Sequence, residues 1–582
     1  MVTTATRPAE TSGTAQDVPE LEGFDDFVLK LMREWKVNGV AVAIARGGEI
    51  VLSKGYGLRD VEQGLEVTPH TLMPIGSTTK TFTTASIALL ADEGLVDWDT
   101  PVRQYLPTFK LWDEFATERM TPKDMGCHRS GLPRHELLWY GSTQSRQALF
   151  DRLRYLEPTA DFRTVWQYQN LMFMALGYLT DELSGLSWED FIQKRIFDPL
   201  GMVSSTSTST QAKEAADLSR GYRKKDNKVV EMPLYEGFHA VSPCGSIVSS
   251  VADMSQWLLV HLNGGKHGDR QFLSEPQVRE MHKPQMVIEQ GQYAELPYSS
   301  YGLAWFVQPY RGRSMIHHGG NIDGFSSQLA LMPDDQVGVV VLTNMDGTPT
   351  RDIITYNVLD RFIGGEQVPW NDRFTALQKE MKAAKARGKE KSKLDRVRGT
   401  RPSHRLEAYT GTYRHPGYGD IRIGLDNGKL QATHNDIEFM VKHVHYDVFD
   451  VTVERFGFTF KASFISDERG AINQLTVPLE PSVAPIVFTR LPDASMTDRS
   501  FLEPFVGAYE VMGAVMAVEF KGDVLQISMP GQPAFELVPV AGTEFAFKGL
   551  SNFSVAFKRD GSGAVTEALV NQMGTVLQAK KR

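Results

Sequence analysis

The sequence predicts an α/β (α+β) domain, an antiparallel sheet flanked by helices, followed by two small antiparallel β-barrel domains. Three observations carry this prediction: an early β-hairpin, a helical middle after which strands return, and an internal repeat in the last third of the chain. A hairpin and a late meander on either side of a helical middle fit one sheet built from both ends of a domain.

The elements of the first domain follow from hydrophobic spacing. A helix is expected at Phe24–Trp35, where apolar residues recur with a helical period. Residues 40–46, the turn Gly47-Gly48 and residues 49–53 together predict the hairpin. Residues 95–290 are expected to be mainly helical. Late strands are expected at 301–307, 314–317, 328–332 and 337–342, and a last helix near 352–362.

Composition changes divide the chain into five parts. We expect a disordered lead-in at 1–21, the first domain at 22–367, a basic linker at 368–404, and β-barrel domains at 405–495 and 496–582. The linker holds a run of cations: Lys379, Lys382, Lys385, Arg387, Lys389, Lys391 and Lys393. Such a tract could bind anions or nucleic acid, but a solvated helical linker is favoured in an acidic chain.

An internal repeat predicts the two barrels. Residues 406–413 (LEAYTGTY) return as residues 502–509 (LEPFVGAY), and each copy is followed by short strands with glycine turns. Two related domains of about 90 residues each, both small antiparallel barrels, fit that spacing.

Length, charge and cysteine content argue against several classes of protein, among them membrane-spanning and nucleic-acid-binding proteins. The chain has 582 residues, 41% hydrophobic and 23% charged, with a formal net charge of −9, which argues against a nucleic-acid surface. No apolar run approaches the roughly 20 residues that cross a bilayer, and no signal segment is expected. We therefore expect a cytoplasmic protein without membrane or nucleic-acid partners, and leave a homodimer open. Cys127 and Cys244 are expected to be buried thiols.

Ser77 and Lys80 form an S-x-x-K motif at the start of a predicted helix that runs to about residue 95. On a helix the i, i+3 spacing places both side chains on one face. Serine is a weak nucleophile without an adjacent base, and Lys80 would supply one. Alone, the pattern also fits a capping serine beside a solvated lysine. Further motifs are needed to distinguish a catalytic pair from this structural one.

Two later stretches supply such motifs. Tyr168 and Asn170 precede an apolar helix and could point into a shared cleft, although Asn170 could also be an N-cap. Residues 316–327 are polar and glycine-rich, which lets backbone approach a ligand. The paired His317 and His318 also invite a metal site, but neighbours on a strand point to opposite faces and no partner stands at ligand spacing.

Taken together, the S-x-x-K, Y-x-N and H-x-G motifs resemble the serine β-lactamase and penicillin-binding-protein superfamily. Within it the chain resembles the class C-like branch, with D-aminopeptidases, family VIII esterases and other enzymes of peptidase family S12. Residues 127–133 and 242–250 carry the likeness further, and residues 405–491 resemble a β domain often appended to such enzymes. The resemblance implies a β-lactamase/transpeptidase-like fold followed by lipocalin-like barrels.

The resemblance also implies a chemistry that proceeds through an acyl-enzyme. Ser77 would be the nucleophile, Lys80 would take its proton, and Tyr168 would relay a proton or activate the deacylating water. Asn170 would hydrogen-bond the substrate amide, and the backbone N–H groups of Ser77 and Asn321 would form the oxyanion hole. Which of Lys80 and Tyr168 is the principal base stays open. Neither a cofactor nor a metal is expected.

The third motif departs from the family pattern. The distance to Gly324 favours His318, followed by Gly319 and Gly320, over His317. Penicillin-recognising members usually carry a lysine here, whose cation attracts the substrate carboxylate. Histidine is mostly neutral near pH 7, so its pull on a free carboxylate is weaker. We therefore expect little β-lactamase or carboxypeptidase activity, and a small-molecule or short-peptide substrate.

The expected function is a serine hydrolase (peptidase S12-like or esterase) acting on small amide or peptide substrates, including those with D-amino acids, as in aminopeptidases. Three alternatives stay open: a broad-specificity carboxylesterase with weak β-lactamase activity, a peptide cyclase or transferase, and a non-catalytic penicillin-binding sensor or scaffold. The complete set of Ser77, Lys80 and Tyr168 favours an enzyme over a scaffold.

Overall fold

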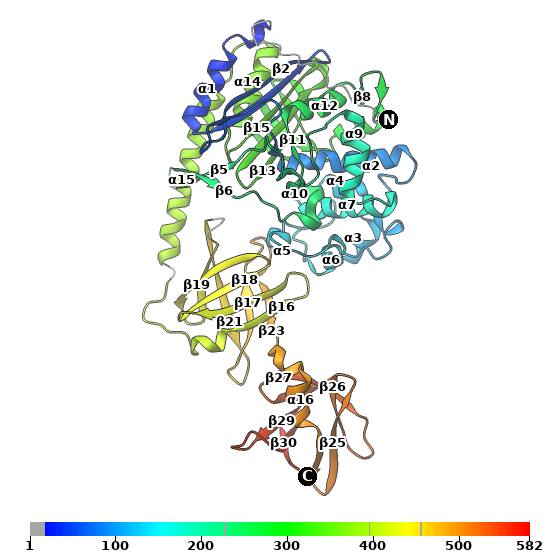
Figure 1. Cartoon of the computed structure of the whole chain (residues 1–582), viewed down its shortest axis with the longest axis vertical. Coiled ribbons are helices and arrows are strands. Elements are labelled where there is room, and N and C mark those ends of the chain that lie inside the picture. Colours follow the sequence, from blue (N-terminus) through cyan, green and yellow to red (C-terminus); the bar gives the residue numbers. More distant parts are fainter. Residues whose placement is uncertain (1–17, 226–227, 395, 454–456) are drawn as a thin grey trace. The chain divides into compact units, whose positions relative to one another are not determined.

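The computed structural model describes residues 18–225, 228–394, 396–453 and 457–582 (Figure 1). These residues fall into two compact units. The first comprises the chain up to residue 395 together with the short loop of residues 479–484, and the second comprises the rest of the chain beyond residue 395. Each unit is considered by itself.

The first unit is built on a nine-stranded antiparallel sheet with the order β10-β11-β12-β13-β14-β15-β1-β2-β3. Strands from both ends of the domain meet where β1 pairs with β15, which confirms the sheet expected from the sequence. The bounds are β1 Gly39–Arg46, β2 Glu49–Asp60, β3 Leu65–Glu66, β10 Met286–Tyr293, β11 Leu296–Tyr301, β12 Phe306–Tyr310, β13 Arg313–Ile322, β14 Phe325–Met332 and β15 Val337–Thr343.

One strand prediction was wrong. Residues 301–307 do not form a single strand, because β11 ends at Tyr301 and β12 begins at Phe306. Between them the chain leaves the sheet: the backbone N–H of Leu303 donates to Met281, and that of Ala304 donates to Gly126. Ala304 also has a φ of 66°, in the left-handed region that an extended strand does not use.

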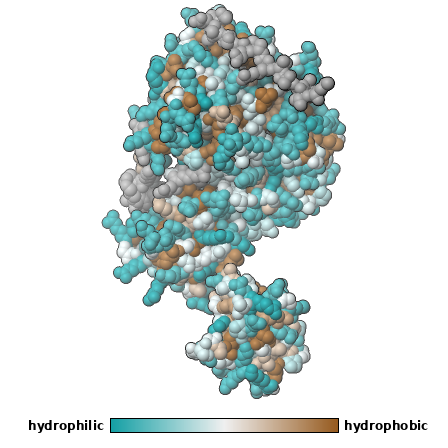
Figure 2. All heavy atoms as spheres, viewed as in Figure 1, coloured by the Kyte–Doolittle hydropathy of each residue, from teal (hydrophilic) through white to brown (hydrophobic). Residues whose placement is uncertain are grey.

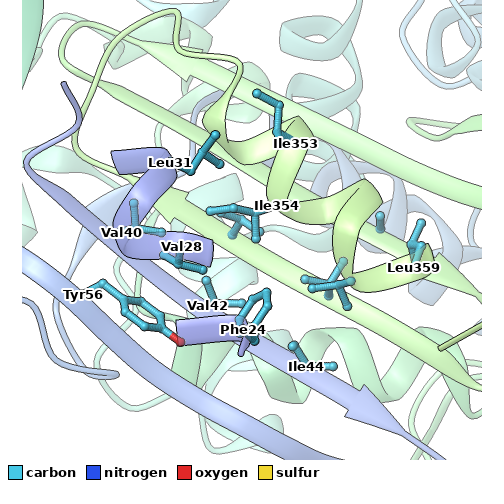
Figure 3. Packing of buried hydrophobic residues seen from close by; sticks show 14 of the residues in the cluster. Phe24, Val28, Leu31, Val40, Val42, Ile44, Tyr56, Ile353, Ile354 and Leu359 are labelled. Carbon is cyan, nitrogen blue, oxygen red and sulfur yellow. The ribbon is translucent and has the colours of Figure 1, made fainter. Parts of the chain in front are cut away.

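The core lies between one face of the sheet and two helices, α1 (Phe24–Trp35) and α14 (Thr350–Ile363), both of which were predicted. Figure 3 shows side chains from α1 and α14 packed over strand residues Val40, Val42 and Ile44. These three alternate with residues that face away, as the period of two in a strand requires. On the other face, Gly338 lies against Leu258 of α12 (Val251–Leu262).

The middle of the first unit is mainly helical, as expected, with three added two-stranded ribbons (Figure 1). Its remaining helices are α2 Thr79–Asp92, α3 Glu114–Arg119, α4 Pro122–Gly126, α5 Glu136–Trp139, α6 Arg146–Arg152, α7 Asn170–Ser184, α8 Trp188–Ile192, α9 Asp198–Leu200, α10 Ser209–Ala212, α11 Ser242–Gly245 and α13 Glu275–His282. The ribbons pair β4 Met73–Pro74 with β7 Val248–Ser249, β5 Gly221–Lys225 with β6 Lys228–Met232, and β8 Lys266–His267 with β9 Arg270–Gln271.

The predicted basic linker begins as a long helix, α15 (Trp370–Leu394). Its first turn is anchored, because Trp370 is buried in the core and Arg373 forms an ion pair with Glu295 at 2.9 Å. Most side chains described farther along it are exposed, including Lys379, Lys382 and Lys385.

The second unit contains two closed eight-stranded antiparallel barrels, as the repeat predicted. The first comprises β16 Gly411–His415, β17 Gly419–Asp426, β18 Lys429–His434, β19 Ile437–His445, β20 Val448–Val453, β21 Phe458–Ser466, β22 Ile472–Val477 and β23 Ile486–Arg490. The second comprises β24 Gly507–Val511, β25 Ala514–Lys521, β26 Val524–Ser528, β27 Phe535–Ala541, β28 Glu544–Phe547, β29 Phe553–Arg559, β30 Val565–Gln572 and β31 Thr575–Lys581.

Both copies of the repeat form the same local structure. In the first, the buried hydroxyl of Tyr413 donates to the carbonyl of Tyr409 at 2.9 Å. In the second, the buried hydroxyl of Tyr509 donates to the carbonyl of Phe505 at 2.7 Å. Each tyrosine thus ties the first strand of its barrel to the 3-10 turn that precedes it.

None of the helices among the described residues is both long enough and apolar enough to span a bilayer. On the face shown in Figure 2, hydrophobic residues lie scattered among hydrophilic ones.

Candidate active site

Ser77 and Lys80 lie side by side in the first unit. Ser77 is on a single 3-10 turn, Gly76–Thr78, and Lys80 is in the first turn of α2, which continues it. The Nζ atom of Lys80 lies 3.1 Å from the Oγ atom of Ser77. The i, i+3 spacing predicted that both residues lie on one helix. The structure places Ser77 on the tighter turn just before that helix, and the two side chains still meet.

The Lys80 side chain is completely buried. Its Nζ donates to the backbone carbonyl of Cys244 at 2.7 Å and lies 4.8 Å from the ring centroid of Tyr168 and 5.4 Å from that of Phe173. Aromatic faces attract a cation, and the carbonyl accepts one N–H. The amine is therefore held in one position beside Ser77.

Cys127 and Cys244 are both buried and free, as expected. Burial raises the pKa of each thiol to about 12, so both stay protonated near neutral pH. Cys244 thus contributes its backbone carbonyl, and not a thiolate, to the surroundings of Lys80.

Tyr168 and Asn170 flank the start of α7. Gln169 caps that helix by accepting the backbone N–H of Leu171 at 2.9 Å, so Asn170 is its first residue and not its cap. The ring of Tyr168 packs against Lys80 and lies 4.4 Å from the ring of His128. Within the described ranges, no hydrogen bond joins the Tyr168 hydroxyl to Ser77 or Lys80; the contact with Lys80 is through the ring.

The two histidines of the third motif lie on opposite faces of β13. His318 is 1% exposed, and its ring lies 6.3 Å from that of Tyr168. His317 hydrogen-bonds Gln328 at 3.0 Å and stacks on Phe306. In the part of the chain that the structure describes, no group of three His, Cys, Asp or Glu side chains could hold a metal ion.

His318 is held as a neutral imidazole. Its Nδ1 lies 2.7 Å from the carbonyl oxygen of Gly319, which can only accept, so Nδ1 carries the proton and Nε2 accepts from the hydroxyl of Tyr301 at 2.9 Å. Burial and the positive charge of Lys80 lower the pKa of His318 well below its ordinary value. Near pH 7 the third motif therefore supplies no cation.

Glycines allow the end of β13 to touch the turn that carries Ser77. A methyl group on Gly76, whose φ is 51°, would lie 2.9 Å from the backbone nitrogen of Asn321. One on Gly320 would lie 1.9 Å from the carbonyl oxygen of Ile75, closer than any real contact. The Arg351 guanidinium donates to the carbonyl of Gly320 and so fixes the Gly320–Asn321 peptide. The Asn321 amide is thereby brought beside the Ser77 turn.

A pocket of about 210 Å³ opens over Ser77. Four residues of its wall have charged side chains, and two of them, Arg134 and Glu136, pair with each other at 3.0 Å. Glu136 Oε1 also accepts from the amide nitrogen of Asn170 at 2.9 Å. Burial raises the pKa of the Glu136 carboxyl, against the attraction of Arg134 and Lys80. The other lining residues are Gly76, Trp139, Tyr140, Phe238, Cys244, Gly245, Asn321, Ile322, Asp323 and Asp346.

The β-lactamase family model matches residues 24–361, which is more than half of the chain. This chain belongs to the β-lactamase family. Residues 395–490 match a second model, described as a domain of unknown function (DUF3471), over the region of the first barrel. The first match spans Ser77, Lys80, Tyr168 and His318, so all of the predicted motifs lie within the β-lactamase-family domain.

Two curated relatives of this family member are fungal. The chain is 30% identical over 434 residues to "Unguisins hydrolase ungD'" of Aspergillus campestris, covering 70% of this chain and 78% of the relative. It is 28% identical to "Unguisins hydrolase ungD" of Aspergillus violaceofuscus, covering 76% and 85%. Among solved structures, the octameric penicillin-binding protein homologue from Pyrococcus abyssi matches with a TM-score of 0.53 at 21% identity, covering 81% of this chain and all of that one, and so shares the fold.

Two residues that no sequence motif predicted also contact the site. Glu136 fixes the amide of Asn170, and Tyr301 donates to the buried ring of His318. Glu136 lies only three residues beyond the 127–133 segment that carried the family likeness, which was a usable signal. No sequence signal pointed to Tyr301, because its contact with His318 depends on how the strands pair.

Proposed function

We propose that this β-lactamase-family protein is a serine hydrolase that forms an acyl-enzyme on Ser77 and acts on small amide and peptide substrates, including those with D-amino acids. The observation that carries the proposal is the 3.1 Å contact between Ser77 Oγ and the buried Nζ of Lys80. A hydroxyl becomes an effective nucleophile when a base that can take its proton lies within hydrogen-bond distance.

Acylation would begin with attack of Ser77 Oγ on the substrate carbonyl carbon, while Lys80 in its amine form takes the hydroxyl proton. The tetrahedral intermediate then collapses: the bond to the leaving amine or alkoxide breaks, and the proton passes to that group. Lys80 is the preferred base, because it and not the Tyr168 hydroxyl is within hydrogen-bond distance of Ser77. Tyr168 would shape the Lys80 site with its ring. A water molecule would repeat the sequence to release the acid.

The developing oxyanion would be bound by the backbone N–H groups of Ser77 and Asn321. The close approach of Gly76 to the Asn321 nitrogen supports this pairing. Such preorganised donors contribute about 3 kcal/mol each to transition-state stabilisation. Asn170, held by Glu136, would orient the substrate amide, and Gly319 and Gly320 would let the substrate backbone approach β13.

Two further observations support the proposal, one on the type of reaction and one on the substrate class. The relatives in the two Aspergillus species are named as hydrolases, which supports hydrolysis here. The neutral state of His318 supports substrates without a carboxylate beside the scissile bond, in contrast to the penicillin-recognising pattern with lysine.

The proposal is tested with a D-alanine p-nitroanilide and a p-nitrophenyl ester, comparing the wild type with Ser77→Ala. Turnover of the anilide that Ser77→Ala abolishes supports the amide hydrolase. Turnover of the ester alone would identify a carboxylesterase. If neither is cleaved and a fluorophosphonate leaves Ser77 unmodified, the chain is a binding protein or scaffold and the proposal fails.

A further inference from the structure

A second, larger cavity of about 710 Å³ lies in the first unit beside the Ser77 pocket. Four segments that are far apart in the sequence form its walls: α1 at Trp35, β5 at Arg223 and Lys224, the loop of residues 345–349, and α15 at Gln378 and Lys382. Figure 1 shows β5 and β6 next to α15.

The cavity carries positive charge in excess. Arg223 is compensated, because its guanidinium pairs with Asp346 at 2.9 Å. Lys224 and Lys382 form no ion pair with any carboxylate among the described residues; Lys382 only approaches the amide oxygen of Gln378 at 3.5 Å. Burial and the charges of Lys382 and Lys36 lower the pKa of Lys224, as expected where cations face one another without an anion between them.

Backbone contacts hold this cationic wall in place. The backbone N–H of Tyr222 on β5 donates to the carbonyl of Gly324, and the N–H of Asp346 donates to the carbonyl of Tyr222. The strand that carries Arg223 and Lys224 is therefore fixed to the loops that follow β13 and β15. Lys382 belongs to the basic tract of α15, which the hydrolase mechanism does not use.

The cavity adjoins the Ser77 pocket, because Asp346 lines both. The half of the substrate that enters the Ser77 pocket can also be inferred. The Ser77 pocket is lined by Asn170 and Asn321, whereas Lys80, the group placed to transfer a proton to the leaving group, does not line it. The pocket would therefore receive the acyl half of the substrate, and the cationic cavity lies farther along that half.

We propose that Lys224 and Lys382 form a subsite for a carboxylate on the far end of the acyl group, so that the preferred substrates are amides of acyl groups that end in a carboxylate. The inference rests on the proposed function and deepens it. It also accounts for the departure in the third motif. His318 supplies no cation beside Ser77, and Arg134 in the Ser77 pocket is paired with Glu136, whereas Lys224 and Lys382 of the adjoining cavity have no carboxylate partner among the described residues.

The experiment compares N-succinyl-alanine and N-acetyl-alanine p-nitroanilides, each in D and L form, which share a leaving group and differ in the terminal carboxylate. For the wild type, the KM of the succinyl substrate is expected to be about fivefold lower at low salt, and the preference should shrink at high salt because exposed charges are screened. Lys224→Gln and Lys382→Gln should each reduce the preference and together abolish it.

The matched control is Lys379→Gln, which removes an exposed lysine of α15 that does not line the cavity and should keep the preference. Equal KM values for the two substrates, cleavage of neither, or a preference that survives in the double variant would overturn the inference. Labelling of Ser77 by a fluorophosphonate separates the outcomes. If Ser77 is labelled but the succinyl substrate is not preferred, only the proposed subsite is rejected. If Ser77 is not labelled, the proposed function is rejected as well.

Discussion

The Nζ atom of Lys80 lies 2.7 Å from the carbonyl oxygen of Cys244. A carbonyl only accepts hydrogen bonds, so it binds one N–H of the amine and leaves the rest of the group directed at other partners, of which Ser77 Oγ at 3.1 Å is one. These two contacts fix the orientation of the Lys80 amine beside Ser77, and most of the chemistry proposed for this site depends on that orientation.

Replacing Lys80 by methionine should therefore stop acylation while the packing is kept. General-base groups contribute about 10²–10⁴-fold, so the rate of Ser77 labelling by a fluorophosphonate should fall by that factor. Lys379→Met, on the exposed surface of α15, should label at the wild-type rate. A Lys80→Met protein that is folded and labels as fast as the wild type would exclude Lys80 as the base.

Glu136 should act through Asn170. Glu136→Ala removes the acceptor that fixes the Asn170 amide and should lower kcat/KM for amide substrates by about tenfold, the effect of one charge-assisted hydrogen bond. Glu136→Gln keeps an acceptor and should lose less. The rate of labelling by a small fluorophosphonate, which has no amide to orient, should change little. An equal loss in both variants would point to the charge of Glu136 and not to its hydrogen bond.

The contact between β13 and the Ser77 turn has no room for a methyl group. Gly320→Ala would place one 1.9 Å from the carbonyl oxygen of Ile75, so the Asn321 amide must move away from Ser77. Loss of one oxyanion donor costs about 10²–10³ in kcat. Gly424→Ala, in open space on β17, is the control and should leave activity unchanged. Normal kcat in a folded Gly320→Ala protein would argue against Asn321 as a donor.

Buried histidines should make the first unit sensitive to mild acid. Burial lowers the pKa of His128, His261 and His318 well below 6.5, and each is at most 2% exposed. Below pH 6.5 the unfolded chain binds protons that the folded one does not. Stability is therefore flat above pH 6.5 and falls as the pH drops, by at most about 1.4 kcal/mol per pH unit for each histidine.

Thermal unfolding measured between pH 7 and 5, above the range where most carboxylates titrate, checks this expectation. His261→Gln, remote from the Ser77 pocket, should give a shallower slope than the wild type. A midpoint that does not change over this range would show that the three imidazoles accept protons in the folded state.

The repeated tyrosines should stabilise their barrels independently. Tyr413→Phe removes the hydrogen bond to Tyr409 and Tyr509→Phe removes the one to Phe505, both buried. Each should cost about 1–2 kcal/mol, because a buried carbonyl loses its donor. Hydrogen exchange resolved by segment should show faster opening in residues 411–490 for the first variant and in residues 507–581 for the second. Faster opening in both segments for either variant would mean that the barrels unfold together.

Much of the fold could be predicted because its signals are local. The apolar spacing of α1 recurs over the whole helix, and the Gly47-Gly48 turn marks the hairpin of β1 and β2. The repeat around Tyr413 and Tyr509 indicated two barrels of one kind. The prediction failed at residues 301–307, where the sequence looks extended. Bonds from Leu303 and Ala304 to distant segments pull the chain out of the sheet, and such contacts cannot be inferred from neighbouring residues.

In the site, too, contacts between residues close in the sequence could be predicted and contacts between distant residues could not. Ser77 and Lys80 meet because they are three residues apart on consecutive turns, and the family likeness supplied Tyr168 and His318. The partner of Asn170 could not be predicted, because Glu136 lies 34 residues earlier in the chain and reaches it only through tertiary packing. The basic run that includes Lys382 was visible in the sequence, but its proximity to Lys224 on β5 was not, since the two lysines come together only in the folded chain.

The proposed hydrolysis depends on the acylation of Ser77. Intact-protein mass spectrometry of the wild type and Ser77→Ala tests this step, with samples quenched during turnover of a D-alanine p-nitroanilide and, separately, after exposure to a fluorophosphonate. The wild type should carry the phosphonyl group, and the acyl group where deacylation is the slower step, on the peptide that contains Ser77, and Ser77→Ala should carry neither. Turnover by a protein that takes up no phosphonyl group on Ser77, or an adduct that persists in Ser77→Ala, would exclude Ser77 as the nucleophile.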